Sequence, residues 1–320
     1  MIQEQDVITV EGLRKYYGSV KAVDNVTFQV RKNEIFGMVG PNGSGKTTTI
    51  ECIEGLRQAD EGRLSVLGLD PQRDIYELRE RTGVQLQSSN LPGRMRVEEA
   101  LNLFSSFYRQ AAEWRSLIEE LGLSEKRRTL YSQLSGGQKQ RLFVALALIN
   151  RPEIVFLDEL TTGLDPQARH ATWDLVREIQ GRGATVFLTT HFMEEAERLC
   201  DRVAIMDQGR IIALDTPENL VCQLGMGTRL IFQLDKQDAA AFEPARIGAI
   251  DGVRRVEQQG KEVVVYGQGD GLISAVILAL ENVRLSIHNL RTEQANLEDA
   301  FLALTGHAIR NQGAVILKEN

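Results

Sequence analysis

The sequence predicts an α/β protein built on a mostly parallel sheet, with a small α+β domain after it. Residues 153–159 (EIVFLDE) and 184–191 (ATVFLTTH) are continuous apolar runs, the pattern of strands that are buried on both faces. Strands that alternate with helices along the chain indicate a parallel sheet covered by helices. A change of pattern near Leu224 marks the start of the second domain.

The other elements of the first domain follow from periodicity. Residues 26–30 and 34–40 read as strands, and a helix should begin in the glycine-rich stretch that follows. Between residues 97 and 121, apolar side chains recur at helical spacing, at Leu101, Phe104, Phe107 and Leu117. Residues 203–213 predict a hairpin that turns at Gln208-Gly209.

The second domain has a different texture. Residues 229–235, 261–267 and 284–290 alternate like half-buried strands, and residues 272–280 and 297–306 are apolar helical stretches. Strands and helices in this mixed order predict a separate α+β domain.

The 320 residues are enough for two domains, with an ordinary balance of 42% hydrophobic and 25% charged residues. We expect the first domain over residues 1–223, the small α+β domain over 224–307 and a tail over 308–320, where periodicity is weak.

Charge and hydropathy exclude several classes of protein. A net charge of -7 argues against a general nucleic-acid binder. The longest apolar run, residues 142–149, is too short to span a bilayer, and residues 1–7 resemble no signal peptide, which predicts a cytosolic protein. Cys52, Cys200 and Cys222 fit no metal or redox spacing, which indicates small buried residues that stay reduced.

Residues 40–47 (GPNGSGKT) fit the phosphate-binding loop G-x-x-x-x-G-K-[ST] between a predicted strand and a predicted helix, the context that the motif requires. Glycines allow a tight turn whose N–H groups point at phosphate oxygens, and the helix N-terminus adds positive potential. Lys46 would reach the β and γ phosphates, and Thr47 would bind Mg²⁺. The predicted nucleotide-binding residues are Gly40, Pro41, Asn42, Gly43, Ser44, Gly45, Lys46, Thr47 and Thr48.

Two carboxylates complete this phosphate site. Asp158 ends a buried strand, where an acidic partner for Mg²⁺ is needed. Glu159 follows directly and would orient or deprotonate the water that attacks the γ-phosphate. The sequence therefore predicts a P-loop NTPase that binds ATP and Mg²⁺.

A second glycine-rich stretch, LSGGQKQR at residues 134–141, also opens an apolar helix. LSGGQ resembles the signature of the ATP-binding cassette (ABC) ATPases. The resemblance implies an ABC core with antiparallel β and helical subdomains, and two such domains that meet head to tail around ATP. Ser135, Gly136, Gly137 and Gln138 would then contact the γ-phosphate held by the partner's loop.

The remaining ABC motifs occur in the family's order over roughly residues 7–220. Tyr17 matches the aromatic residue that stacks on adenine, Asp165 the aspartate at the dimer interface, and His191 the histidine at the γ-phosphate. Gln87 matches the glutamine that touches Mg²⁺ and water, with Gln85 as a rival on the same strand face. Leu160 stands where the family usually has proline, which removes a φ restraint.

Within the family, three stretches resemble the drug-resistance export branch that includes daunorubicin pumps: TGVQLQS, THFMEEAERLCDRVAIMDQGRI and LEDAFLALTG. This resemblance implies an ATP-hydrolysing export subunit, peripheral on the cytoplasmic face of the membrane, that handles hydrophobic drug-like molecules or lipids. Its partners would be an integral membrane permease and a second nucleotide-binding subunit, identical or similar, but no nucleic acid. Residues 87–104 would form the dock for the permease.

Three alternatives differ in sequence or in partners. ABC proteins that act on chromosomes carry long coiled coils between their ATP motifs, and ABC translation factors carry two cassettes and a basic linker. This chain has a short gap without heptads, one cassette and no basic linker. A nucleotide-gated regulator without a transport role remains open.

Overall fold

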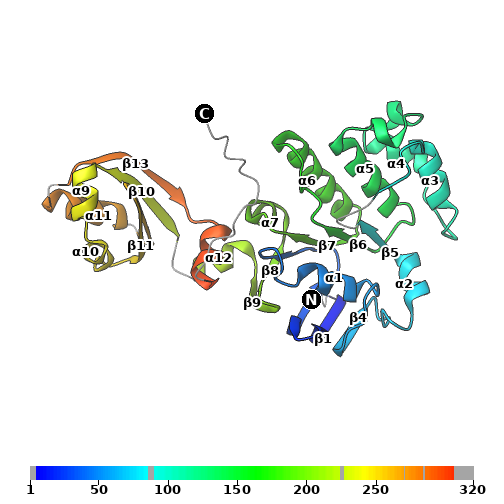
Figure 1. Cartoon of the computed structure of the whole chain (residues 1–320), viewed down its shortest axis with the longest axis horizontal. Helices are drawn as coiled ribbons and strands as arrows, with labels where there is room; N and C mark the ends of the chain where they lie inside the picture. Colours follow the sequence, from blue (N-terminus) through cyan, green and yellow to red (C-terminus); the bar gives the residue numbers. More distant parts are fainter. Residues whose placement is uncertain (1–4, 86–89, 224–226, 270, 284, 306–320) are drawn as a thin grey trace. The chain divides into compact units, whose positions relative to one another are not determined.

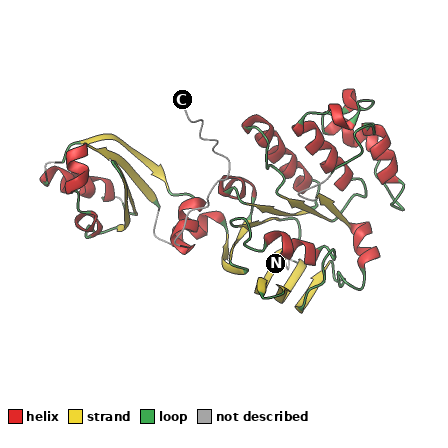
Figure 2. Cartoon of the chain, in the orientation of Figure 1, coloured by secondary structure: helices red, strands yellow, loops and turns green. Residues whose placement is uncertain are grey.

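The computed structural model describes residues 5–85, 90–223, 227–269, 271–283 and 285–305, with the side chains of residues 236, 240 and 241 left out. The described residues form two compact units, which divide between Asp215 and Thr216. Figures 1 and 2 show that both units combine helices with strands.

A six-stranded sheet with the order β5-β6-β7-β3-β8-β9 forms the centre of the first unit. The neighbouring strands are parallel except for the β8–β9 pair, which is antiparallel. The strands are β3 (Ile35–Val39), β5 (Thr82–Gln85), β6 (Ile154–Asp158), β7 (Thr185–Thr190), β8 (Arg202–Asp207) and β9 (Arg210–Asp215). β3, β6 and β7 are buried at every position, as their continuous apolar sequences predict.

A second sheet of the first unit is antiparallel, with the order β2-β1-β4. Its strands are β1 (Asp6–Tyr17), β2 (Val20–Arg31) and β4 (Glu61–Val66). From Val26 to Arg31 buried and exposed residues alternate along β2, so one face of that strand packs on the core. The sequence predicted only part of β2 and missed β1 and β4.

Helix α1 (Lys46–Ile53) and a row of aromatic rings join the two sheets. The ring of Phe28 in β2 stacks on Phe36 of β3 with a centroid distance of 5.3 Å. Phe187 of β7 lies 5.4 Å from Phe36 and 5.9 Å from Phe156 of β6. This aromatic row packs β2 against three neighbouring strands of the parallel sheet.

The helical part of the first unit follows β4 and surrounds the β5 edge (Figure 1). It contains α2 (Ile75–Arg81), α3 (Val97–Ser105), α4 (Trp114–Glu120), the 3₁₀ turns Ser124–Lys126 and Tyr131–Gln133, and α5 (Gly136–Ala147). The helical stretch predicted over 97–121 is two helices, because the chain leaves the helix after Ser105 and leaves Phe107 62% exposed. Trp114 at the start of α4 ties them together by donating to Asn102 Oδ1 at 2.8 Å.

Helices α6 (Pro166–Gly181) and α7 (Met193–Leu199) complete the first unit. The hairpin predicted at Gln208-Gly209 is confirmed as the β8–β9 turn. Both turn residues have positive φ angles of 45° and 79°, the backbone that a tight hairpin requires.

The second unit contains a four-stranded antiparallel sheet with the order β11-β12-β10-β13. Its elements are α8 (Pro217–Gln223), β10 (Thr228–Leu234), α9 (Lys236–Ala241), α10 (Pro244–Gly248), β11 (Val253–Gln259), β12 (Glu262–Gly267), α11 (Leu272–Asn282), β13 (Ile287–Gln294) and α12 (Leu297–Thr305). The unit begins at Thr216 and not at residue 224, because α8 packs against α12. Cys222 in α8 is exposed, so the expectation of burial is correct only for Cys52 and Cys200.

Glu54 is a buried acid at the end of α1. Its side chain is 5% exposed, and within the described structure neither carboxylate oxygen has a hydrogen-bond partner. Burial raises the pKa of Glu54 to about 9, and the nearby charge of Asp158 adds to the shift. The folded chain therefore holds Glu54 as a neutral acid at pH 7, whereas the unfolded chain ionises it.

This difference predicts a pH-dependent stability. Because the folded pKa lies above the ordinary value of 4.5, the stability is fully present below pH 4.5 and is lost as the pH rises toward 9. Glu54→Gln, which stays neutral, should remove about 1.4 kcal/mol per pH unit from the slope of the unfolding free energy. Urea unfolding of both proteins at pH 6 and pH 8 measures the slope. Glu125→Gln on the surface is the control, and equal slopes for wild type and Glu54→Gln would contradict the prediction.

Candidate nucleotide-binding site

The register of three parallel strands brings the predicted site residues together. Val39 at the end of β3 pairs with Thr190 of β7, and Asp158 at the end of β6 pairs with Thr189. The segments that follow these strand ends carry the phosphate-binding loop, Glu159 and His191. The carboxyl ends of these strands therefore bring together two of the predicted catalytic residues, Glu159 and His191, with the phosphate-binding loop and Asp158.

The phosphate-binding loop needs its glycines. A Cβ on Gly40 would lie 2.1 Å from the Met206 carbonyl oxygen, and a Cβ on Gly45 would lie 2.3 Å from the Ala22 carbonyl oxygen. Gly43 and Gly45 also have positive φ angles, of 80° and 105°. The loop is thus held by backbone contacts that only glycine allows.

Lys46 begins α1 and is 4% exposed. Its ammonium group donates to the carbonyl oxygens of Gly40 at 2.8 Å and Pro41 at 3.0 Å. Ser44 is buried in the same loop, and its hydroxyl has no hydrogen-bond partner in the described structure. A buried ammonium with three donors and an unpaired hydroxyl fit an anionic ligand such as a phosphate group.

The other predicted loop residues line the outer side of this loop or the first turn of α1. Asn42 and Gly43 are exposed, and Pro41, Thr47 and Thr48 are half-buried.

Asp158 is 3% exposed and accepts a hydrogen bond from the Thr189 hydroxyl, and the nearby Thr47 hydroxyl acts to lower the pKa of the same carboxyl. Burial raises the pKa of the Asp158 carboxyl, and the hydrogen bond from Thr189 opposes this effect. A carboxylate beside the Thr47 hydroxyl is an oxygen donor set that suits Mg²⁺ shared with a phosphate. The sequence did not predict a role for Thr189, although the change from apolar to polar residues at the end of β7 marks this position.

Glu159 and His191 face each other. His191 Nδ1 lies 3.4 Å from Glu159 Oε1, and this contact holds the pKa of the Glu159 carboxyl below its ordinary value. The Glu159 backbone has a positive φ of 49° and its N–H donates to the Thr189 carbonyl oxygen at 3.1 Å. Thr162 donates to the other carboxylate oxygen at 3.3 Å. An ionised, oriented carboxylate is what a general base requires.

Burial and nearby charges shift the pKa of Lys46 in opposite directions. Burial lowers the pKa of the Lys46 ammonium, and the carboxylates of Glu159 and Asp158 raise it. The influence of both acids indicates that the lysine and the carboxylates share one electrostatic environment.

The signature stretch forms the exposed N-terminus of α5. Ser135 caps the helix by accepting from the Gln138 N–H at 3.4 Å, and the Gln138 side chain accepts from the Ser135 N–H at 3.0 Å. Ser135 and Gly136 are exposed, and a Cβ added to Gly136 would meet no atom within 4 Å among the described residues outside its own helix turn. In the described part of the chain, no hydrogen bond links residues 135–138 to the phosphate-binding loop.

Two further predicted residues lie on the surface of the first unit. Asp165 is exposed and caps α6 by accepting from the Ala168 N–H at 2.9 Å. Tyr17 is 42% exposed at the end of β1, with the Arg57 guanidinium 5.3 Å from its ring centre. Gln87 lies outside the described residues, and β5 is described only to its rival Gln85, which is 5% exposed.

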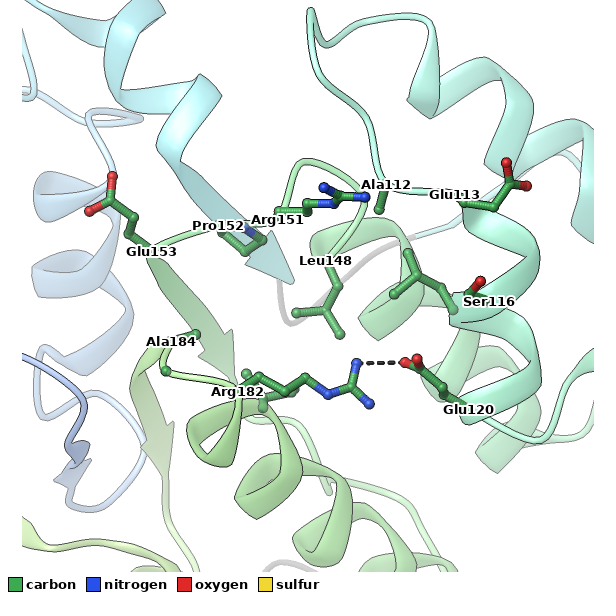
Figure 3. Close-up of a pocket in the computed structure, with 13 residues that line it drawn as sticks. Ala112, Glu113, Ser116, Glu120, Leu148, Arg151, Pro152, Glu153, Arg182 and Ala184 are labelled. Carbon is green, nitrogen blue, oxygen red and sulfur yellow. Dashed lines mark hydrogen bonds and ion pairs between the residues drawn. The ribbon is translucent and has the colours of Figure 1, made fainter.

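A separate cavity of about 440 Å³ lies at the amino ends of β6 and β7 (Figure 3). Glu153 and Ala184, which precede these strands, line it together with Leu148. Arg182 Nη1 donates to Glu120 Oε2 at 2.5 Å across its rim. Because Asp158 ends β6 and His191 follows β7, both at the carboxyl ends of these strands, this cavity is not the phosphate site.

Comparison with known proteins shows the family of the chain. The profile of the family described as ABC transporter matches residues 23–162. The chain is 37% identical to the Nod factor export ATP-binding protein I of Ralstonia nicotianae, with 95% of each chain covered. It is 36% identical to a daunorubicin resistance ATP-binding protein of Streptomyces coeruleorubidus, over 93% of this chain and 96% of that protein.

Solved structures show the same fold. An ATP-binding subunit of an ABC transporter gives a TM-score of 0.62 at 29% identity, covering 68% of this chain and 93% of that one. An ATP-binding cassette of an ABC transporter in its ADP conformation gives a TM-score of 0.62 at 28% identity, covering 69% and 94%. The predicted fold class is therefore confirmed.

The geometry of Glu159 predicts the effect of its removal. Glu159→Gln should bind ATP as the wild type does and lose turnover by about 10²–10⁴-fold, the usual contribution of a positioned base. Phosphate release measures turnover, and equilibrium binding of a fluorescent ATP analogue measures affinity. Glu153→Gln, at the other end of the same strand, is the matched control. Turnover of Glu159→Gln within a few-fold of wild type would remove Glu159 from this role.

Proposed function

Because the chain belongs to the ATP-binding proteins of ABC transporters, which are ATP hydrolases, we propose that it is the ATP-hydrolysing subunit of an exporter and drives a separate membrane permease. The observation that carries this proposal is the cluster of Lys46, Asp158, Glu159 and His191 at one sheet edge. The names of the similar proteins, Nod factor export and daunorubicin resistance, support export as the purpose of hydrolysis.

Each group of the cluster has a distinct task in this proposal. Lys46 and the loop N–H groups bind the phosphates, and the adenine stacks on the exposed ring of Tyr17. Thr47 and Asp158 would hold Mg²⁺, with Gln87, which lies outside the described residues, as the third expected ligand, and the ion would neutralise charge on the phosphates. Glu159 orients the attacking water and accepts its proton, while His191 keeps Glu159 aligned beside the γ-phosphate.

The signature loop is proposed to act on the nucleotide of a second copy. α5 has no acidic residue in its first turn, so its positive end is available to an anion from outside the chain. Asp165 at the start of α6 would face the same partner. Two chains, or this chain and a similar one, would then enclose ATP between the loop of one and the signature of the other.

The sandwich predicts ATP-dependent association. Glu159→Gln should form a dimer at saturating Mg-ATP and remain a monomer with ADP, because the γ-phosphate is bound but not consumed. Adding Ser135→Glu should restore the monomer, since a carboxylate at that helix end repels the γ-phosphate. Sedimentation velocity measures the state, and Ser124→Glu on the surface is the control. A monomer in every nucleotide state would contradict the sandwich.

A groove beside the β5 edge is the proposed dock for the permease. A cavity of about 870 Å³ lies between α2 and the segment after α3, lined by Tyr76, Glu80, Arg109 and Asn150 among others. Tyr76 is 82% exposed, whereas the Asn150 amide donates to three carbonyl oxygens around the end of α2 at 2.8 to 3.3 Å. A rigid floor with an exposed aromatic rim suits an amphipathic helix of a partner.

The described part of the segment that the sequence predicted, residues 90–104, does not line this cavity, and we propose that its exposed residues and Phe107 form a second part of the dock. Phe107 and Leu103 are 62% and 43% exposed, and Arg94 and Arg96 are exposed as well. Phe104 is half-buried, and its ring lies 5.7 Å from that of Phe107. No helix among the described residues has both the length and the apolar character to cross a membrane. A peripheral position on the cytoplasmic face follows if the permease supplies the membrane contact.

The dock can be tested in the native host. Tagged Glu159→Gln, solubilised with mild detergent and Mg-ATP, should copurify with a polytopic membrane protein in stoichiometric yield by mass spectrometry. Phe107→Glu, or charge reversal at Arg94 and Arg96, should reduce that yield about tenfold or more, as expected for the loss of an interface anchor. Val20→Glu is the control, because Val20 is also 62% exposed. Only soluble partners would favour the nucleotide-gated regulator instead.

A further inference from the structure

Glu195 is a buried carboxylate beside the catalytic cluster, with no task in the function proposed above. It lies in α7, the helix that follows β7, and is 2% exposed. Its Oε1 accepts a hydrogen bond from Trp173 Nε1 at 3.1 Å. Because a buried carboxylate is costly unless several donors surround it, its surroundings are informative.

The hydroxyls of Thr190 and Thr161 lie close enough to this carboxylate to lower its pKa, although the Thr161 hydroxyl makes no hydrogen bond of good geometry within the described structure. Burial raises the pKa of Glu195, and the two hydroxyls and the Trp173 N–H act in the opposite direction. Thr190 and Thr161 are 1% and 0% exposed. Thr190 directly precedes His191, and Thr161 follows Glu159 by two residues. The Glu195 carboxylate therefore lies near both segments that carry the catalytic pair, the turn after Glu159 and the strand end before His191.

Helix α6 is the third segment at this carboxylate. Trp173 lies on α6, and Arg169, one turn earlier, places its guanidinium 4.4 Å from the ring centre of Phe192. The Arg169 charge also favours the ionised form of Glu195 and so lowers its pKa. The Phe192 N–H in turn donates to Thr190 Oγ1 at 3.0 Å. The helix that Asp165 caps is thus joined to the segment around His191 by two contacts one turn apart.

We propose that Glu195 is a positioning residue that holds the turn after Glu159, the end of β7 before His191 and helix α6 in one arrangement. The inference rests on the catalytic roles proposed above for Glu159 and His191. A carboxylate suits this task because its two oxygens accept several hydrogen bonds from different directions. The 3.4 Å contact between His191 and Glu159 depends on both segments being fixed.

The alternative is that Glu195 only stabilises the fold. A structural residue would change the stability of the chain and the binding of nucleotide together with turnover. A positioning residue changes kcat and leaves binding intact, because displacement of a catalytic group by about 1 Å can cost about 10²-fold in rate. The change in kcat compared with the change in nucleotide affinity therefore separates a positioning role from a folding role.

The test uses the full chain with Glu195→Ala, Glu195→Gln and Trp173→Phe. Glu195→Ala should lower kcat by about 10²-fold with the Kd for Mg-ATP changed less than about threefold. Glu195→Gln keeps an acceptor for Trp173, and the threonine hydroxyls can rotate to accept from its amide, so kcat should return to within about fivefold of wild type. Trp173→Phe removes one hydrogen bond to Glu195 and should lower kcat about tenfold.

Glu194→Gln is the matched control, because Glu194 is the neighbouring residue on α7 with a 57% exposed side chain. Wild type and this control establish hydrolysis in the same assay, so the proposed activity is judged independently. Wild-type kcat in Glu195→Ala and Trp173→Phe would overturn the positioning role. Parallel losses of kcat, nucleotide affinity and thermal stability, without rescue by glutamine, would overturn it in favour of a folding role. If Glu195→Ala does not fold, Trp173→Phe and Glu195→Gln decide by the same criteria.

Discussion

The register of three parallel strands is the constraint on which the candidate site depends. β3 pairs with β7, and β7 pairs with β6, so that Val39, Thr190 and Asp158 end their strands at nearly the same level. Because side chains alternate between the two faces of a strand, a slip of one residue would turn Asp158 away from Thr189 and from α1. The aromatic row through Phe36, Phe156 and Phe187 packs at the middle of these strands and opposes such a slip.

The same edge gives two neighbouring carboxylates different properties. Asp158 continues the strand into the buried interior, and burial raises its pKa. The next residue, Glu159, has a left-handed backbone with φ of 49°, which for a residue with a side chain costs about 1 to 3 kcal/mol. This turn directs the Glu159 side chain to His191, and the contact lowers the pKa of the Glu159 carboxyl. The left-handed turn thus gives two adjacent carboxylates different surroundings, Asp158 in the buried interior and Glu159 beside His191.

The sequence predicted the centre of the site and much of the parallel sheet because uniformly apolar strands reveal where polar residues end them. It did not predict features that depend on distant packing. Phe107 has helical spacing but is exposed, because the chain leaves the helix after Ser105. Glu194 and Glu195 are adjacent residues of the same type, but Glu195 is buried and accepts a hydrogen bond from Trp173 in another helix, whereas the Glu194 side chain is exposed.

Leu160 shows the same limit at a single position. The sequence predicts a turn with a free φ, since the proline usual in the family is missing. The structure buries the Leu160 side chain to 4% exposure, and the turn is closed by the Thr162 N–H that donates to the Glu159 carbonyl oxygen at 3.2 Å. Packing of Leu160 and this hydrogen bond therefore restrain the turn in place of a proline ring. Such compensation involves the surrounding core and cannot be derived from the local sequence.

Helix α5, which begins in the signature stretch, differs from α3 and α7 in the charge of its first turn. α3 and α7 each begin with two glutamates in the first turn, which neutralise the positive end of the helix dipole within the chain. α1 and α5 have none. At α1 the phosphate-binding loop encloses the helix end, whereas at α5 Ser135 and Gly136 are exposed. An exposed helix end without acidic residues suits an anion. In the sandwich proposed above, a phosphate bound at α1 of another chain would be that anion.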